Sequence, residues 1–277
     1  MAKAKSAFVC TECGAEYRKW QGQCTSCQEW NTLSEVRLAA ARPGAGSAGA
    51  GSGRSGYAGA LTREVVDLAN VDLSEVPRLS STFGEFDRVL GGGLVPGSAV
   101  LLGGHPGAGK STLLLQTACK LAQSRGVLYV TGEESLSQVA MRAHRLQLPV
   151  AGLKMLAETS IETILAVAER ERPEILVIDS IQTMHLEDIA SAPGGVAQVR
   201  ESAAALTRFA KQSNTVLLLV GHVTKDGTLA GPKVLEHMID ASLLLEGGAD
   251  SRFRTLRGQK NRFGAVNELG VFAMLEH

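Results

Sequence analysis

The feature that most constrains this chain is a glycine-rich loop at residues 103–112, which reads Gly-Gly-His-Pro-Gly-Ala-Gly-Lys-Ser-Thr. From Gly104 it matches G-x-x-x-x-G-K-S, a loop whose backbone N–H groups surround phosphate oxygens. An apolar run precedes it and apolar residues at helical spacing follow it. The alternative, a glycine-rich turn with an accidental lysine, does not explain this context. We predict that the nucleotide is held by Gly104, His105, Pro106, Gly107, Ala108, Gly109, Lys110, Ser111 and Thr112.

Two side chains of this loop have predicted roles toward ATP as the substrate. Lys110 is expected to reach the β- and γ-phosphates, and the Ser111 hydroxyl to hold Mg²⁺. The helix that follows directs its positive end toward the same anion.

Composition limits the classes of protein to consider. Lys plus Arg and Asp plus Glu both number 28, so the net charge is zero and any surface for nucleic acid must be local. No apolar run is long enough to span a membrane, and the N-terminus lacks the apolar core of a signal peptide. We therefore expect a cytoplasmic protein without membrane contact, in which paired cysteines bind metal rather than form disulfides.

Four cysteines near the N-terminus form two C-x-x-C pairs. Two such pairs complete a tetrahedral Zn²⁺ site, and a module this small depends on the metal for most of its folding energy. A redox function is disfavoured because no βαβ pattern surrounds the pairs. The predicted zinc ligands are Cys10, Cys13, Cys24 and Cys27.

The rest of the N-terminal region suggests three segments. We predict a zinc module over residues 1–36, a flexible linker rich in Ala, Gly and Ser over 37–60, and an ATPase domain over 61–277. Trp20 and Trp30 are expected to pack around the cysteine pairs rather than stack on bases. Cys119 is expected to be a small core residue.

Residues 61–277 alternate between continuous apolar runs and helical patterns. This alternation, together with the phosphate loop, predicts an α/β fold, a P-loop core with a mostly parallel central sheet covered by helices. The strand at 127–131 is expected to lie beside the strand of the phosphate loop. Three further apolar segments, at 242–245, 253–259 and 269–275, predict antiparallel strands at the C-terminal end.

Carboxylates follow two of the predicted strands. Asp179 ends the strand at 175–178, where it would face the ligand crevice and hold Mg²⁺ beside Ser111. The alternative is an ordinary strand-end cap. Glu133 and Glu134 follow the strand at 127–131, and adjacent residues face opposite ways, so we expect one of them to act on the attacking water. We favour Glu133, although both could be solvated carboxylates at a helix start.

The order of these motifs resembles that of a known family. The four cysteines, the phosphate loop, Gly-Glu-Glu-Ser at 132–135, Val-Ile-Asp-Ser at 177–180 and Lys-Asn-Arg-Phe-Gly at 260–264 follow one another. This series resembles the RadA (Sms) family of bacterial DNA repair proteins, relatives of the RecA recombinases, over essentially the whole chain. The stretch at 260–264 is its specific signature.

The resemblance implies several properties. It implies a RecA-like ATPase that forms hexameric rings on single-stranded and branched DNA, drives branch migration and works with a RecA-type recombinase. It also implies that Lys110, Ser111 and Asp179 form the nucleotide site, and that Lys260 and Arg262 are the signature basic pair. Family members carry a further Lon-like domain, so we expect this chain to be a shortened form.

Lys260 and Arg262 also have a physical interpretation. Residues two apart on an extended strand project from one face, and two cations there need an anionic partner. The γ-phosphate of a neighbouring subunit would serve, which makes both candidate catalytic residues supplied in trans. The alternative is a solvated edge strand protected by charge.

Two glycine-containing loops, at 185–196 and 222–235, are candidate DNA contacts at the carboxyl ends of strands. Few aromatic residues are available for base stacking, so phosphate contacts are the expected mode. These loops could also be ordinary surface loops. The candidate phosphate-binding residues are Lys225, Lys233 and, in the helix after the first loop, Arg200.

The expected function is therefore a DNA-dependent ATPase of the helicase type in recombinational repair. A nucleotide-switched assembly scaffold and a phosphotransferase remain alternatives, and stimulation of hydrolysis by DNA distinguishes the motor from both.

Overall fold

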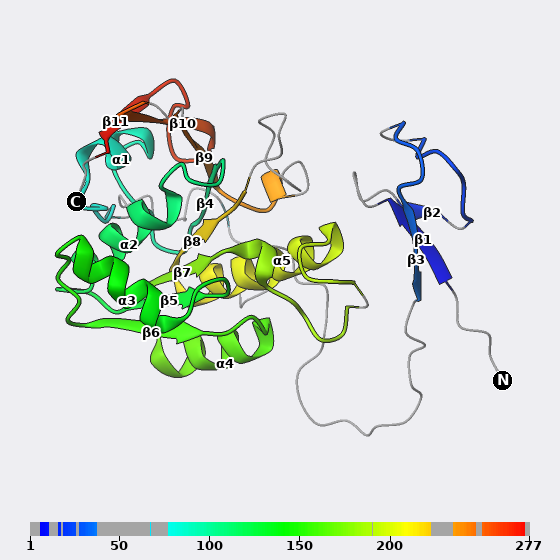
Figure 1. The fold of residues 1–277 in the computed structure, drawn as a ribbon, viewed down its shortest axis with the longest axis horizontal. Helices are drawn as coiled ribbons and strands as arrows, with labels where there is room; N and C mark the ends of the chain where they lie inside the picture. The colour runs from blue at the N-terminus through cyan, green and yellow to red at the C-terminus, as the bar shows by residue number, and fades with distance from the viewer. Residues whose placement is uncertain are drawn as a thin grey trace.

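A computed structural model describes residues 6–10, 16–17, 19–25, 28–37, 67, 77–189, 191–222, 235–247 and 251–274 (Figure 1). Its N-terminal part is a small antiparallel sheet of order β2-β1-β3. Strand β1 (Ser6–Cys10) pairs with both β2 (Glu16–Tyr17) and β3 (Leu33–Arg37). Cys10, Cys24 and Leu33 form its buried cluster, so this module has little apolar core of its own.

The predicted packing of the two tryptophans around the cysteines is wrong. Trp20 is 57% exposed and Trp30 is 67% exposed. An isolated bridge joins Trp30 to Gln23, and a Cβ added at Gly22 would lie 3.6 Å from the Trp30 ring and 3.9 Å from the Trp20 ring. The two rings thus flank Gly22 on the outside of the module, because Leu33 and the cysteines already fill its interior.

The main domain is built on an eight-stranded sheet of order β11-β10-β9-β4-β8-β7-β5-β6. The pairs among β9, β4, β8, β7, β5 and β6 are parallel, whereas β10 pairs antiparallel with β9 and β11. The mostly parallel sheet with antiparallel C-terminal strands is confirmed. The strands are β4 (Ala99–Gly104), β5 (Val127–Thr131), β6 (Leu153–Ala157), β7 (Ile175–Asp179), β8 (Val216–Val220), β9 (Ala241–Glu246), β10 (Phe253–Asn261) and β11 (Leu269–Ala273).

One predicted neighbour in this sheet is wrong. The strand of the phosphate loop, β4, lies between β8 and β9, and β5 lies between β7 and β6. The chain crosses over β8 and β7 before it lays down β5, and apolar periodicity carries no information on the length of such a crossover.

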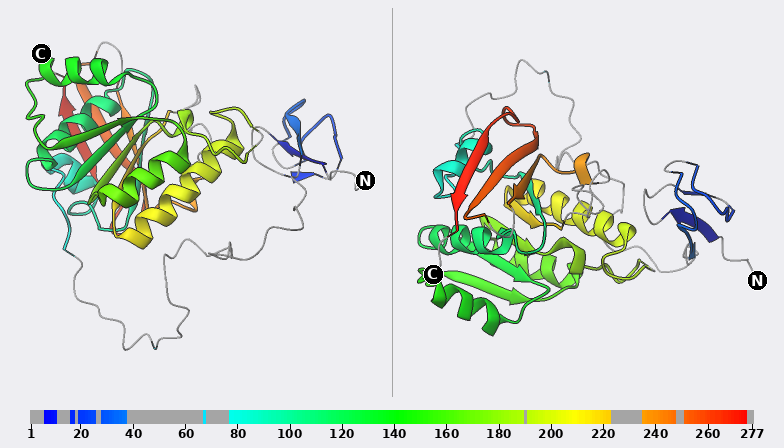
Figure 2. Two further views of the ribbon diagram at one scale, coloured as in Figure 1. Left: turned by 90° about the horizontal axis from the view of Figure 1, so that it is seen from below. Right: turned by 45° about the horizontal axis from the view of Figure 1, so that its top comes forward.

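Helices cover both faces of the sheet (Figure 2). Apolar residues from α1, α2 and α3 belong to one buried cluster, and those from α4 and α5 belong to the other. The helices are α1 (Gly84–Val89), α2 (Lys110–Leu121), α3 (Leu136–Arg145), α4 (Ile161–Glu171) and α5 (Val196–Ser213), with a short 3-10 turn, η2 (Ile181–Thr183).

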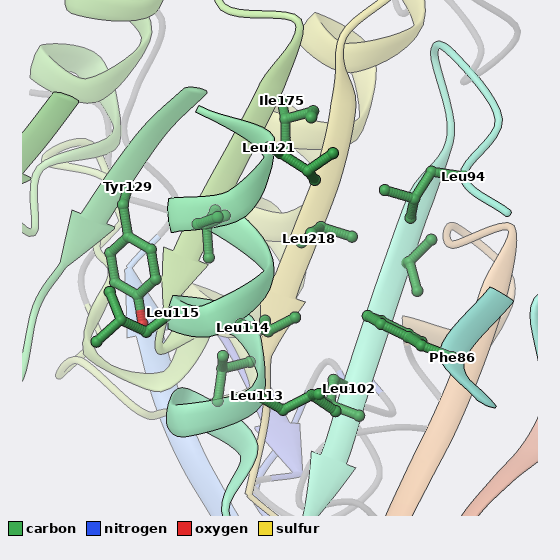
Figure 3. Packing of buried hydrophobic residues seen from close by; sticks show 14 of the residues in the cluster. Phe86, Leu94, Leu102, Leu113, Leu114, Leu115, Leu121, Tyr129, Ile175 and Leu218 are labelled. Carbon is green, nitrogen blue, oxygen red and sulfur yellow. The ribbon is translucent and has the colours of Figure 1, made fainter. Parts of the chain in front are cut away.

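Successive strand residues alternate between the two clusters, which explains why the central strands are apolar throughout. Tyr129 and Val177 face α2, whereas Val130 and Ile178 face the opposite layer. Figure 3 shows leucines of α2 lying against residues of the central strands. Cys119 is fully buried in this cluster, as predicted. The sheet therefore supports the start of α2 rigidly from below.

Candidate nucleotide-binding site

The phosphate loop joins the carboxyl end of β4 to the start of α2, as predicted. Gly107 and Gly109 have φ values of 79° and 99°, in the left-handed region that glycine adopts without strain. Gly104 has a second constraint, since a Cβ there would lie 2.5 Å from the Leu245 carbonyl oxygen on β9. The glycines of the motif are therefore required both by the turn and by close approach of the neighbouring strand.

Lys110 begins α2 and is only 4% exposed. Its Nζ donates hydrogen bonds to the carbonyl oxygens of Gly104, at 2.7 Å, and His105, at 3.0 Å. Burial lowers the pKa of Lys110, while the charges of Asp179 and Glu133 oppose that shift. The ammonium group is thus held at the centre of the loop that is expected to bind phosphate.

Asp179 ends β7 beside the loop. Its Oδ1 accepts a hydrogen bond from Ser111 Oγ at 3.1 Å, and its Oδ2 accepts one from Tyr129 Oη at 2.6 Å. Burial raises the pKa of Asp179, and the hydrogen bonds from Tyr129 and Ser111 oppose that rise. A hydroxyl and a carboxylate within hydrogen-bond distance are the oxygen donors that Mg²⁺ takes, so these two residues fit the predicted magnesium site.

The two consecutive glutamates have different partners. Glu133 Oε1 accepts hydrogen bonds from Ser180 Oγ and from His222 Nε2, the latter at 3.2 Å. Partial burial raises the pKa of Glu133, but the hydrogen bonds from Ser180 and His222 outweigh it, and the net pKa is lowered. Glu134 forms an ion pair with Arg142 of α3. Glu133 is therefore the carboxylate that faces Lys110 in its ionised form.

These side chains line one cavity of about 270 Å³. The sequence assigned no role in this cavity to three of its lining residues, Thr131, Arg142 and His222. His222 lies two residues after the end of β8, so the rule that strand carboxyl ends face the ligand would have found it. Arg142 lies inside a helical pattern, where nothing distinguishes it from a surface arginine. The lining consists of Pro106, Gly107, Lys110, Ser111, Thr131, Glu133, Glu134, Arg142, Asp179 and His222.

Lys260 and Arg262 lie near the amino ends of the parallel strands, at the end of the sheet opposite the phosphate loop. Lys260 is paired with Ser242 at the amino end of β9, whereas the phosphate loop follows the carboxyl end of β4, which is parallel to β9. Lys260 Nζ donates to the carbonyls of Glu236 and Ile239, and Arg262 contacts Asp240 Oδ1 at 3.4 Å. Strand β10 ends at Asn261, so Arg262 lies just beyond it in a turn, yet both side chains reach the segment 236–240.

The candidate DNA contacts are only partly described. Arg200 lies on α5 and pairs with Glu201, with Nε and Oε1 2.9 Å apart. Lys225 and Lys233 lie outside the described residues. The first candidate loop is held by buried Gln198, whose side chain exchanges hydrogen bonds with the backbone of Leu186 and donates to the carbonyls of Ile189 and Ser191.

The predicted zinc ligands are described for one cysteine of each pair. Cys10 and Cys24 are fully buried, and a hydroxyl lies near each sulfur, Thr32 Oγ1 at 3.2 Å and Tyr17 Oη at 3.1 Å. Cys13 and Cys27 lie outside the described part of the chain, and no group of three metal-ligating side chains is found within that part. Two buried sulfurs in one cluster fit half of a four-thiolate site.

Comparisons with known proteins agree with this geometry. A family model described as an AAA domain matches residues 69–228, and one described as a rubredoxin metal binding domain matches residues 8–35. The sequence is 66% identical to the DNA repair protein RadA of Salmonella typhimurium and to that of Escherichia coli, and 46% identical to that of Bacillus subtilis. Each match covers 100% of this chain, which spans 60% of the first two relatives and 59% of the third.

Within the described residues, no helix is both long and apolar enough to cross a membrane. The two family models match the N-terminal cysteine module and most of the main domain, and the RadA relatives align with this chain over both. By these matches the chain belongs to the AAA-domain proteins and, among them, to the RadA family of DNA repair proteins.

Proposed function

We propose that this chain is the ATP-hydrolysing part of a DNA-dependent motor in recombinational repair. The observation that supports it best is the meeting of Lys110, Ser111, Asp179 and Glu133 in one cavity, although they come from three separate segments of the chain. A phosphate-binding loop, two oxygen ligands for a metal and an ionised carboxylate are the groups that ATP hydrolysis requires.

Each residue has a distinct task in hydrolysis. Lys110 and the loop N–H groups bind the phosphate chain, and Lys110 exchanges its bonds to the Gly104 and His105 carbonyls for phosphate oxygens. Ser111 and Asp179 hold the ion, and Mg²⁺, when bound, neutralises charge on the phosphates. Glu133 accepts the proton of the attacking water, a role that its position in the lining of the cavity supports.

Lys260 and Arg262 are proposed to act on the ATP of a neighbouring subunit. Lys260 is paired with Ser242, which is level with Leu101 of β4, three residues or about 10 Å before Gly104. The side chains of Lys260 and Arg262 contact Ile239 and Asp240, which precede β9, so both point away from their own phosphate loop. A ring of like subunits, taken to be a hexamer, would instead present them to the next loop through a heterologous interface.

DNA is the proposed partner that the motor acts on. The relatives are named DNA repair proteins. The proposals of branch migration and of work with a RecA-type recombinase come from the resemblance of the sequence motifs to that family. Because the net charge of the chain is zero, the DNA path must be local, and Arg200, Lys225 and Lys233 are its proposed phosphate contacts.

Stimulation of ATP hydrolysis by DNA tests this function. We expect the rate to rise when single-stranded DNA is added and to fall to background in Lys110→Ala, which should stay folded because Lys110 contacts loop carbonyls rather than core side chains. Hydrolysis that DNA leaves unchanged would contradict the motor and favour a nucleotide-switched scaffold. A Lys110→Ala protein with normal hydrolysis would place the ATP site elsewhere.

A further inference from the structure

Arg142 is a second cation at the cavity that neither the sequence motifs nor the hydrolysis scheme uses. It lies on α3, whose start is fixed by a capping box between Ser135 and Gln138 directly after Glu134. Its side chain is only 18% exposed, and it lines the same cavity as Lys110 and Ser111. The position of Arg142 is therefore set by a capped helix rather than by a surface loop.

The hydrogen bonds of Arg142 are incomplete. One terminal nitrogen, Nη2, pairs with Glu134 Oε1. The other, Nη1, is enclosed and has no hydrogen-bond partner within the part of the chain that the structure describes. Buried guanidinium N–H groups are ordinarily paired, and the planar fork of a guanidinium matches phosphate oxygens.

The charge of Arg142 reaches the phosphate end of the site. Burial raises the pKa of Asp179, and the positive charge of Arg142 opposes that rise. Among the described residues, three carboxylates but only two side chains with a permanent positive charge, Lys110 and Arg142, line the cavity. Arg142 therefore adds to Lys110, and to Mg²⁺ when it is bound, positive charge that offsets the charge of a polyphosphate in this cavity.

We propose that Arg142 binds the phosphate chain of the nucleotide within its own subunit through Nη1, while Glu134 fixes the plane of its guanidinium through Nη2. This inference rests on the proposed ATP site. Arg142 differs from Lys260 and Arg262 in that it serves the cavity of the chain to which it belongs.

Equilibrium binding of ATP and of inorganic tripolyphosphate tests the inference. In Arg142→Ala we expect both affinities to fall by about 10-fold to 100-fold, the loss for one hydrogen bond to a charged group. Arg142→Lys should recover part of the loss, because it restores the charge without the fork. Arg145→Ala is the matched control, since Arg145 lies on the same helix but does not line this cavity, and both affinities should be unchanged.

The outcomes separate this inference from the proposed function. Wild-type protein that binds ATP, together with an Arg142→Ala protein of unchanged affinity, overturns the role of Arg142 alone. Loss of ATP binding with unchanged tripolyphosphate binding assigns Arg142 to the base or ribose and also overturns it. A wild-type protein that binds neither ligand refutes the ATP site itself. The thermal unfolding midpoint of Arg142→Ala should stay close to that of the wild type. If Arg142→Lys loses its affinity for both ligands and also shows no cooperative unfolding transition, Arg142 has a structural role instead.

Discussion

Glu133 and Glu134 are adjacent in the chain but have different surroundings. The sequence predicted that only one of them reaches the reacting water, and this followed from backbone geometry alone. It could not decide between them on physical grounds, because the deciding partners, Ser180 and His222, lie 47 and 89 residues away from Glu133. The ion pair of Glu134 with Arg142 occupies the other carboxylate.

Glutamine substitutions distinguish the two carboxylates. Glu133→Gln should lower the rate of ATP hydrolysis by about 100-fold or more, because it removes the proposed base, while nucleotide affinity is retained. Glu134→Gln should lower the rate by less than about tenfold, below the range for loss of a general base, because it removes only the ion-pair partner of Arg142. Steady-state kinetics and nucleotide titration measure both. Equal losses in the two variants would contradict the assignment of Glu133.

The hydrogen bond from Ser180 predicts a shift in pH dependence. This bond lowers the pKa of Glu133, against the raising effect of burial. A base must be ionised, so hydrolysis declines as the pH falls through that pKa. Ser180→Ala removes the bond and raises the pKa, and the acid limb of the pH–rate profile should move to higher pH. When Ser180→Ala is added to Glu133→Gln, the pH–rate profile should be the same as that of Glu133→Gln alone. A shift between these two profiles would assign the acid limb to a group other than Glu133.

At the scale of elements, local patterns were sufficient to find most strands and helices. The central strands are apolar on both faces, and α3 and α4 begin after serines whose side chains accept hydrogen bonds from the first turn. The order of the strands was less accessible, since the position of β5 depends on which neighbours its connection crosses. The exposed Trp20 and Trp30 were missed because a module with so small an interior offers no room for them.

The zinc module should lose its metal without affecting the ATPase domain. We expect about one Zn²⁺ per chain in the wild type and loss of that ion in Cys24→Ala, since four thiolates are needed to close the site. Metal analysis measures the content, and hydrogen exchange should report unfolding only in the N-terminal segment. Cys119→Ala serves as the control, because Cys119 is buried within α2 and should leave the zinc content unchanged. Wild-type protein purified without chelators and free of zinc would rule the site out.

At the scale of the whole molecule, the phosphate loop and the basic pair, Lys260 and Arg262, lie at opposite ends of the parallel strands. The loop follows the carboxyl end of β4, and Lys260 is paired near the amino end of β9. The sequence suggested that Lys260 and Arg262 act in trans, from residue type and from the family resemblance. Only the register of β10 on β9 shows that this pair and the phosphate loop lie at opposite ends of the strands. The side-chain contacts of Lys260 and Arg262 with segment 236–240 could not be predicted, because this segment before β9 contains no recognisable motif.

Mixing two inactive variants tests the action in trans. Lys110→Ala and Arg262→Ala proteins should each be inactive, for loss of the loop cation and of the neighbour's cation respectively. After confirmed subunit exchange, about a quarter of the interfaces in a heterologous ring pair an intact loop with an intact arginine. Hydrolysis above that of either parent is therefore expected. If both groups act within one subunit, no mixture contains a complete site, and the activity stays at the level of the parents.

The location of the phosphate loop and the basic pair at opposite ends of the strands has a consequence for how activity scales with assembly. Under the proposed arrangement, a productive junction joins the loop of one subunit to the basic pair of the next. An open row of subunits therefore has an unpaired loop at one end and an unpaired basic pair at the other. A row thus always has one productive junction fewer than it has subunits, and only closure brings the two numbers level. Removing one subunit from a closed ring then abolishes two junctions, so the turnover rate would report ring integrity more steeply than it reports protein concentration.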